Sequence, residues 1–442
     1  MNAKKLHSGQ SLIGVLIALA VMIILGQAIF TLTSTSYRLV GFNKARIAAR
    51  HLGQERLEII RNLPYEEIGT LGGIPSGSLA QNETVVLNGL AYTIKTSIVY
   101  VDDPFDDQAP EDILPIDYKR ARIDVSWEGL SPSRKAPVVL VTDIAPRGIE
   151  NTDGGGTLSI LVFDSNANPV PQAQVRIQAG GLTPAIDLSL QTNDNGRIVL
   201  PGAPQCLECY TITATKENYS TDKTYSNAEV ANPDKPLQSI IEGEITEISF
   251  AIDVLSSLNI ATFNSRESGF SPLANTSFTL QGERRIGTDI DDYPVFKFIE
   301  NFSTDENGNI SIDNLEWDNY SFIVSSSVVS GSNPLLPIQL HANETVDLKI
   351  ALSNPTPNSL LAVFSDGNNM TASVSAVLSN SLGFNESKFT GGVNDPDFGQ
   401  VFFSNLSAMT YNLAATASGF LDSISTVNVT GQTTSKTILN PL

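Results

Sequence analysis

The sequence predicts an α+β N-terminal part, made of a long helix packed on an antiparallel sheet, followed by three all-β sandwiches. Three observations predict this fold class. The first 63 residues have helical periodicity and end at a proline. The remainder is rich in Ser, Thr, Asn, Gly, Val and Ile in alternating apolar and polar runs, which is typical of strands. From residue 157 onward, the same landmarks recur three times.

The helix begins with a membrane-spanning stretch. Residues 12–30 read LIGVLIALAVMIILGQAIF, with Gln27 as the one strongly polar side chain. About 20 apolar residues in a helix cross the ~30 Å hydrocarbon core of a bilayer. Lys4, Lys5 and His7 precede this stretch, so the positive-inside rule keeps the leader in the cytoplasm and places the bulk outside. We therefore expect a single-pass protein of the cytoplasmic membrane.

The helix is expected to continue beyond the membrane and to span residues 10–63. An apolar stripe that can dock on a sheet is formed by Ala45, Ala48, Ala49, Leu52, Leu57, Ile59 and Ile60. Pro64 then ends the helix because it lacks the backbone N–H. A secretory signal peptide would need a small-residue cleavage site after the apolar stretch, and residues 31–38 offer no convincing one. An ordinary signal anchor stays open as an alternative.

The residues at the start of the apolar stretch carry a family resemblance. Ser8 to Leu19, SGQSLIGVLIAL, resembles the prepilin signal of type IV pilins and of the pseudopilins of type II secretion systems. The resemblance implies that prepilin peptidase removes the leader, residues 1–9, by cutting after Gly9. It also implies that Gln10 becomes the methylated N-terminus. The implied partners are this peptidase, other pilin or pseudopilin subunits and the inner membrane.

One position departs from the family pattern. The fifth residue after the expected cleavage is usually Glu, and here it is Gly14. In the family, this carboxylate is thought to pair with the N-terminal amine of the subunit ahead. A carboxylate in hydrocarbon costs ~2.5–3.5 kcal/mol, so it is expected only where a partner compensates for it. Gly14 therefore suggests a minor subunit at a filament tip; sequence drift or looser packing in an ordinary minor subunit are the alternatives.

A small β domain is expected over residues 64–147. Its predicted strands are residues 84–87, 92–101, 121–127 and 136–142, and Asn88-Gly89 is a strong hairpin signal between the first two. The arrangement resembles the sheet that pilins pack against their helix. Residues 148–156 are glycine-rich and polar, which predicts a linker.

The charge of the chain argues against nucleic-acid binding, and one acidic loop raises the question of calcium binding. The 442 residues carry 47 acidic and 27 basic side chains, a net charge of −20, and no basic cluster, so nucleic-acid binding is not expected. No cofactor is expected, and calcium on one acidic loop is the less favoured alternative. The carboxylates of that loop are Asp102, Asp103, Asp106, Asp107, Glu111 and Asp112. A solvated loop is the favoured interpretation because a charge cluster without a defined ligand spacing is usually a solvated surface.

The only two cysteines, Cys206 and Cys209, are close in sequence and lie before a predicted strand. Outside the cytoplasm, a local disulfide is chemically permitted, and two free thiols are the alternative. A redox-active pair is disfavoured because such a pair normally opens a helix.

Three repeats of about a hundred residues follow the linker: 157–254, 255–354 and 355–442. Each has an opening strand, a later turn and a strand around a tyrosine. The opening strands are 157–163, 257–263 and 359–364, the turns lie in 192–200, 304–312 and 394–403, and the tyrosines are Tyr210, Tyr320 and Tyr411. Residues 169–175 and 304–315 resemble the carboxypeptidase-regulatory-like, or prealbumin-like, family of Ig-like sandwiches. That resemblance brings no peptidase activity.

The sequence contains no catalytic triad, phosphate loop or metal-ligand spacing, so no enzyme is expected. The predicted function is that of a minor type IV pilin or pseudopilin that displays its sandwiches at the cell surface for adhesion or contact with an extracellular ligand. One alternative is a filament-priming factor without adhesion. Another is an anchored surface protein that never polymerises. A sugar- or protein-binding module is a third, and would need Trp317, Tyr293 and Phe296 to form a platform.

Overall fold

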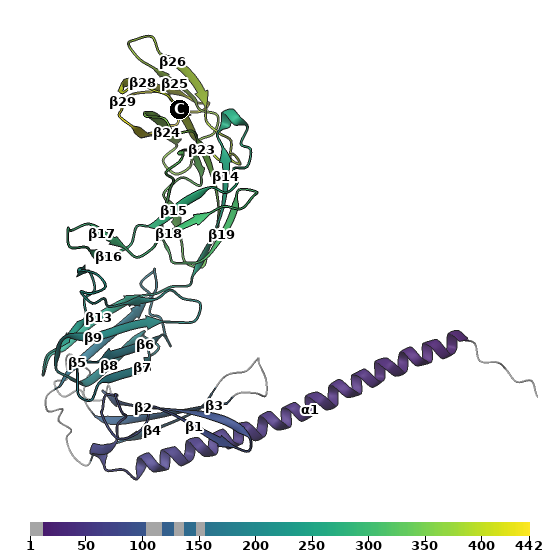
Figure 1. Ribbon diagram of the computed structural model, residues 1–442, viewed down its shortest axis with the longest axis vertical. Coiled ribbons are helices and arrows are strands. Elements are labelled where there is room, and N and C mark those ends of the chain that lie inside the picture. The colour runs from purple at the N-terminus through teal and green to yellow at the C-terminus, as the bar shows by residue number, and fades with distance from the viewer. Residues whose placement is uncertain (1–11, 103–116, 128–136, 147–154) are drawn as a thin grey trace, which may run out of the picture.

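The computed structural model describes residues 12–102, 117–127, 137–146 and 155–442. It confirms the predicted fold class: one N-terminal helix on an antiparallel sheet, followed by three β-sandwiches (Figure 1). Buried apolar side chains form four separate clusters, one in the helix-and-sheet head and one in each sandwich. Each unit therefore has a core of its own.

The head is one long helix on a four-stranded meander. Helix α1 spans Leu12–Arg61, and a 3₁₀ turn, Tyr65–Glu67, follows Pro64. The strands are β1 (Asn82–Leu87), β2 (Leu90–Val101), β3 (Tyr118–Trp127) and β4 (Val138–Ile144), paired in this order. Asn88 and Gly89 both have positive φ, as a type I′ hairpin turn requires. The predicted strands are confirmed, with the last one shifted by two residues.

The C-terminal half of α1 lies on β2, β3 and β4 through small and branched side chains. Ala45, Ala49 and Ile60 are almost completely buried. A Cβ at Gly53 would overlap the side chain of Leu140, so this glycine lets the helix approach β4 closely. The expected stripe is confirmed except at Ile59, which is 38 % exposed because it is turned about 100° from Ile60 around the helix axis.

The three sandwiches share one topology. In each, the opening strand pairs in parallel with the last strand and antiparallel with a middle strand. These sheets are β13-β5-β8, β19-β14-β23-β21 and β27-β24-β30. The facing sheets are built on β6-β9, β15-β20 and β25-β28. The three repeats seen in the sequence therefore fold into three units with the same strand order.

Sandwich 1 contains the following strands: β5 (Gly155–Phe163), β6 (Gln174–Ala179), β7 (Ile186–Gln191), β8 (Arg197–Pro204), β9 (Cys206–Thr215), β10 (Asp222–Lys223), β11 (Asn232–Pro233), β12 (Gln238–Ile240) and β13 (Ile245–Ala251). Gly155 and Gly156, which the sequence assigns to the linker, are instead the first residues of β5. They pair with Pro204 and Ala203, and a Cβ at Gly156 would meet the carbonyl oxygen of Ile241. These glycines lack a Cβ, which lets the neighbouring backbone lie close to β5.

Sandwich 2 contains β14 (Ser256–Asn264), β15 (Ser277–Gly282), β16 (Arg285–Thr288), β17 (Pro294–Phe296), β18 (Ile299–Ser303), β19 (Asn309–Leu315), β20 (Asp318–Ile323), β21 (Val328–Asn333), β22 (Ile338–Leu340) and β23 (Thr345–Ser353), with a 3₁₀ turn at Arg266–Ser268. Sandwich 3 contains β24 (Ser359–Ser365), β25 (Ser375–Ser379), β26 (Asn385–Phe389), β27 (Gln400–Phe403), β28 (Met409–Thr416), β29 (Ser423–Val429) and β30 (Gln432–Ile438).

Each sandwich core contains one buried tyrosine in the strand that the sequence predicts. Tyr210, Tyr320 and Tyr411 lie in β9, β20 and β28. Their hydroxyl groups donate to the carbonyl oxygens of Pro204 at 2.7 Å, Glu316 at 2.9 Å and Ser407 at 3.2 Å. A buried tyrosine needs such a partner for its hydroxyl group, so the same bond is formed in all three units.

The predicted turns cap their own backbone. Oδ1 of Asn193 accepts the N–H groups of Asn195 and Arg197, and Oδ1 of Asp305 accepts those of Asn307 and Asn309. These contacts confirm the turns predicted in residues 192–200 and 304–312.

Candidate functional site

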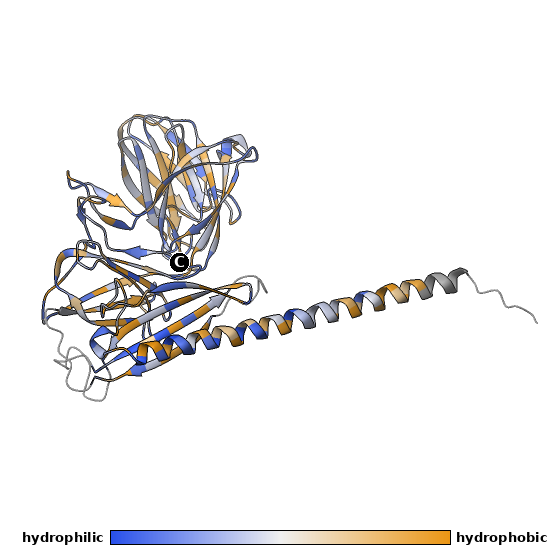
Figure 2. Cartoon of the chain, turned by 60° about the horizontal axis from the view of Figure 1, so that its bottom comes forward, coloured by the Kyte–Doolittle hydropathy of each residue, from blue (hydrophilic) through white to orange (hydrophobic). Residues whose placement is uncertain are grey.

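The N-terminal part of α1 is the first candidate site. At 1.5 Å per residue, the 50-residue helix is ~75 Å long. Its described residues include a stretch long and apolar enough to cross a membrane, and none of that stretch is buried in the protein. Met22, Ile24 and Phe30 are largely exposed, and Figure 2 shows this part of the helix extending away from the sheet. The helix therefore needs lipid or other apolar helices around it.

Three threonines follow the apolar stretch of α1, and their hydroxyl groups bond within the helix. The hydroxyl groups of Thr31, Thr33 and Thr35 donate to the carbonyl oxygens of Gln27, Ile29 and Thr31 at 2.6–2.8 Å. A hydroxyl group bonded one turn back is satisfied within its own helix. The polar side chains at this end of the apolar stretch thus remain compatible with a lipid boundary or a helix interface.

Aromatic and charged contacts fix α1 on the sheet. The ring of Phe42 lies 5.6 Å from that of Trp127, and Arg56 pairs with Glu83 of β1. Under the end of the helix, the buried Lys119 donates to the carbonyl oxygen of Tyr65 at 2.9 Å, with its Nζ 4.3 Å from the Tyr65 ring centre. These contacts give the protruding helix a fixed base.

The residues of the expected processing site are placed only in part. Gly9 and Gln10 lie outside the described residues. Gly14 lies in the first turn of α1, within the apolar stretch. The structure therefore leaves cleavage and methylation as predictions.

The acidic loop that was the weaker candidate for calcium is also placed only in part. Asp102 directly follows β2, whereas Asp103, Asp106, Asp107, Glu111 and Asp112 lie outside the described residues. Within the part of the chain that the structure describes, no group of three His, Cys, Asp or Glu side chains is arranged to hold a metal ion. The structure does not test calcium binding by this loop, which stays the less favoured alternative.

The two cysteines are joined in a disulfide, with their Cα atoms 6.0 Å apart. Cys206 begins β9, and both cysteines pack against the core of sandwich 1. Between them, Glu208 has a positive φ, and its N–H donates to Oγ of Ser239 at 2.8 Å. The bridge lies within β9, where the register of that strand with β12 shifts.

The junctions between units are the second candidate site, because they decide how the sandwiches are presented. The head inserts Ile74, only 1 % exposed, into the core of sandwich 1. In the same head loop, the carbonyl oxygen of Gly72 accepts a hydrogen bond from the N–H of Asp187 at 2.8 Å. Nε2 of Gln81 donates to the carbonyl oxygen of Asp187 at 2.6 Å. The head and sandwich 1 thus share buried apolar surface.

A strand of sandwich 1 pairs with a hairpin of sandwich 2 at the next junction. β11 pairs with β16, which pairs with β17, so this small sheet crosses between the two units. The N–H of Asp234 donates to the carbonyl oxygen of Ile286 at 2.9 Å, and its carboxylate pairs with Arg285 at 3.0 Å. This crossing sheet was not predicted: β11 is only two residues long and has no periodicity to detect.

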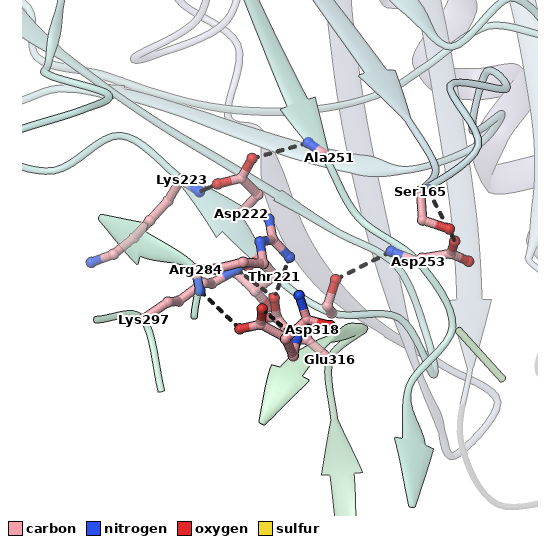
Figure 3. Close-up of polar contacts among 12 residues, drawn as sticks. Ser165, Thr221, Asp222, Lys223, Ala251, Asp253, Arg284, Lys297, Glu316 and Asp318 are labelled. Carbon is pink, nitrogen blue, oxygen red and sulfur yellow. Dashed lines mark hydrogen bonds and ion pairs between the residues drawn. The ribbon is translucent and has the colours of Figure 1, made fainter. Parts of the chain in front are cut away.

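Charged side chains close this second junction (Figure 3). Nζ of Lys297 in sandwich 2 donates to the carbonyl oxygen of Thr221 in sandwich 1 at 2.6 Å and to the carboxylate of Glu316 at 2.8 Å. Beside it, the carboxylate of Asp222 accepts Nζ of Lys235 at 2.5 Å and the N–H of Ala251 at 3.0 Å. The Lys297–Thr221 contact thus crosses the junction, and ion pairs within each sandwich lie beside it.

The third junction joins sandwich 2 to sandwich 3 through a bidentate ion pair. Arg266 donates to the two carboxylate oxygens of Asp397 at 2.7 and 2.5 Å. Burial raises the pKa of Asp397, and the guanidinium of Arg266 counteracts that rise. The fully buried Gln400 exchanges two hydrogen bonds with the backbone of Ser332 across the same junction. All three junctions therefore hold neighbouring units in defined orientations.

The sugar-binding alternative would need three exposed aromatic side chains in one platform, and the structure covers two of them in part. Trp317 is covered by the guanidinium of Arg284, 4.4 Å from the ring centre. Tyr293 directly precedes β17 and is 67 % exposed, whereas Phe296, the last residue of β17, is half-buried. The sequence could not show the cover on Trp317 because that contact joins two segments that are separate in the chain.

Comparison with known proteins gives only distant likenesses. No family model and no curated protein matches the sequence. Among solved structures, the Bacillus anthracis TIE protein is 12 % identical, with 81 % of this chain and 73 % of that chain covered and a TM-score of 0.19. A streptococcal ancillary pilin is 13 % identical (65 % and 99 % covered, TM-score 0.18). BcpA, the major pilin subunit of Bacillus cereus, is 12 % identical (65 % and 99 %, TM-score 0.16). Likenesses this distant carry no conclusion about activity.

Proposed function

We propose that the chain is a minor pilin or pseudopilin of the type IV class that displays three β-sandwiches outward for adhesion or surface contact. The observation that carries the proposal is the division of α1 into two halves. Its N-terminal half exposes apolar side chains around the helix, and its C-terminal half is packed on the four-stranded sheet. A helix of this kind needs lipid before assembly and neighbouring apolar helices afterwards.

In this proposal, prepilin peptidase cleaves after Gly9 on the cytoplasmic side, and Gln10 becomes the methylated N-terminus. The apolar part of α1 stays on the mature protein, first in the cytoplasmic membrane and then among other pilin or pseudopilin subunits. The three junctions support a display role because they hold the sandwiches in a fixed row. The proposed role is structural and involves no catalysis.

The test is the mass and N-terminal sequence of the protein from cells with and without prepilin peptidase, together with its recovery in sheared filaments. A chain that begins at Gln10 only when the peptidase is present, and that is recovered with filaments, supports the proposal. An intact Met1 in both strains, or cleavage after Phe30, contradicts it and leaves an anchored or secreted string of sandwiches. Processing without recovery in filaments would instead indicate a priming factor.

A further inference from the structure

The outer face of the last sheet of sandwich 3 is entirely uncharged. In β26-β25-β28-β29, the core takes the even-numbered residues of β25 and the odd-numbered residues of β28. The pleat therefore points the odd-numbered residues of β25 and β26, and the even-numbered residues of β28 and β29, outward. Every one of these outward side chains is Ser, Thr, Asn, Ala, Val, Ile or Phe. In a chain with a net charge of −20, a four-stranded face without a single outward charge is unusual.

Apolar side chains run across the middle of this face. Val377 is opposite Ala414, and Ala414 is opposite Ile424, so the three form one row across β25, β28 and β29. Phe389 on β26 is diagonal to Val377. Phe389 is 62 % exposed and Ile424 is 78 % exposed, so this row is open to solvent at both ends. Short hydroxyl and amide side chains flank it on both sides, among them Asn412 opposite Thr426.

The same chemistry recurs one unit earlier. The outward residues of β18, β15 and β20 in sandwich 2 are also uncharged: Ser, Thr, Asn, Gln and Ile. In sandwich 1, by contrast, the corresponding face carries the Arg176–Asp187 ion pair, and the backbone of Asp187 contacts the head loop. The neutral face is thus confined to the two units farthest from the head in the row of sandwiches (Figure 1).

We propose that these neutral faces, and the β26-β25-β28-β29 face above all, bind an uncharged polysaccharide. A charged partner would lose hydration on this face without gaining an opposite charge, so neutrality selects an uncharged ligand. Hydroxyl and amide groups at every second residue of adjacent strands match the dense hydroxyl groups of a sugar chain, and the apolar row suits the C–H faces of its rings. A protein interface would instead be rich in aromatic residues and arginine, and Phe389 is the one aromatic here.

Repetition of the face favours a polymer as the ligand. Two successive units with the same surface chemistry can engage successive segments of one long chain, which raises the overall affinity by effective concentration. The surplus of acidic groups elsewhere on the protein also repels anionic polymers. The inference adds a ligand class to the proposed display role and rests on that role.

The test uses detergent-solubilised full-length protein and three solid probes: microcrystalline cellulose, chitin and the anionic polymer alginate. We expect binding to at least one of the two neutral polymers and not to alginate. Phe389→Ala and Thr426→Glu, both at exposed positions, should each weaken that binding at least tenfold while leaving thermal unfolding unchanged. The matched control is Gln432→Glu, which adds the same charge at an exposed position of β30 in the opposite sheet.

Absence of binding to both neutral polymers, equal binding to alginate, or unaltered binding by both face variants would overturn the inference. So would concentration-dependent dimerisation of the wild type that Thr426→Glu abolishes, since the face would then be a contact between copies. Binding is measured on isolated protein, independently of prepilin peptidase and filaments. A protein that binds but is not processed therefore contradicts only the filament role, and one that is processed but does not bind contradicts only the ligand.

Discussion

Replacing Ile74 by Ala should loosen sandwich 1, although Ile74 belongs to the head. The side chain is 1 % exposed and lies in the core cluster of sandwich 1. Ile→Ala removes three carbon groups from that core, which at ~0.8 kcal/mol each costs ~2.4 kcal/mol before any cavity forms. This value lies at the lower end of the 2–5 kcal/mol range for such truncations, so about 2–4 kcal/mol is expected.

Hydrogen exchange measures this loss unit by unit in the full-length protein. Amides of β6 and β9 report the opening of sandwich 1. A loss of ~2.4 kcal/mol lowers their protection ~50-fold. The control is Leu71→Ala in the same loop, because Leu71 is 59 % exposed and should change protection little. If the two variants exchange alike in β6 and β9, Ile74 is no part of that core, and the head and sandwich 1 open independently.

Four further predictions concern the helix, the turns and the other junctions. Gly14→Glu should lower recovery of the chain in filaments, because the carboxylate costs ~2.5–3.5 kcal/mol in hydrocarbon and a tip subunit has no neighbour ahead to pair with it; increased recovery would indicate an internal position. Gly287→Val should separate β11 from β16, because its Cβ would overlap the carbonyl oxygen of Asn232, and X-ray scattering should show a wider spread of shapes than for Gly181→Ala, which has open space. Arg266→Ala should cost about 1.5–3 kcal/mol at neutral pH. That defect should shrink in acid, since burial raises the pKa of Asp397 and protonation removes the unpaired charge; an equal defect at pH 4 and 7 would contradict this. Backbone N–H donors lower the pKa of Asp305, so its stabilisation is present above the unfolded value of ~3.9 and lost as pH falls through the lower folded value. Asp305→Asn keeps the turn and removes this titration, so its melting temperature should fall less than that of the wild type between pH 5 and 2.5.

Local patterns predicted those parts of the fold that depend on neighbouring residues. The Asn88-Gly89 turn and the alternation around it were sufficient for the first hairpin of the head. The tyrosine landmarks correctly marked the same strand in all three sandwiches. In both cases, the physical cause lies within a short segment: positive φ at a turn, or period-2 burial along one strand.

The third repeat confirms the predicted turn and adds a contact that the sequence does not reveal. Its predicted turn, within residues 394–403, matches those of the other repeats: the carbonyl oxygen of Gly399 accepts the N–H of Phe364, as Gly196 and Gly308 accept those of Val162 and Thr262. The structure shows that Thr390 is the counterpart of Thr192 and Thr304. Its buried Oγ1 accepts the N–H of Val374, as those of Thr192 and Thr304 accept the N–H groups of Ala173 and Thr276. A single threonine bonded to a distant backbone leaves no periodic signal.

The junctions and the neutral face depend on contacts between distant segments. Ile74 lies in a short loop whose composition suggests exposure, yet it is buried in another domain. The uncharged face is visible only once the register of four strands shows which residues share it. Charge counted along the sequence gives −20 and conceals a surface on which the local count is zero.

The parallel pairing of first and last strands has a mechanical consequence. In sandwich 1, β5 and β13 are side by side over seven residue pairs, and in sandwich 2, β14 and β23 are side by side over eight. The chain therefore enters each unit at one end of this pair and leaves at the other. A pull between a fixed membrane end and a held distal end would slide the two strands past each other in shear. All the hydrogen bonds of the pair then share the load at once, so each sandwich resists extension far better than a hairpin that opens one bond at a time.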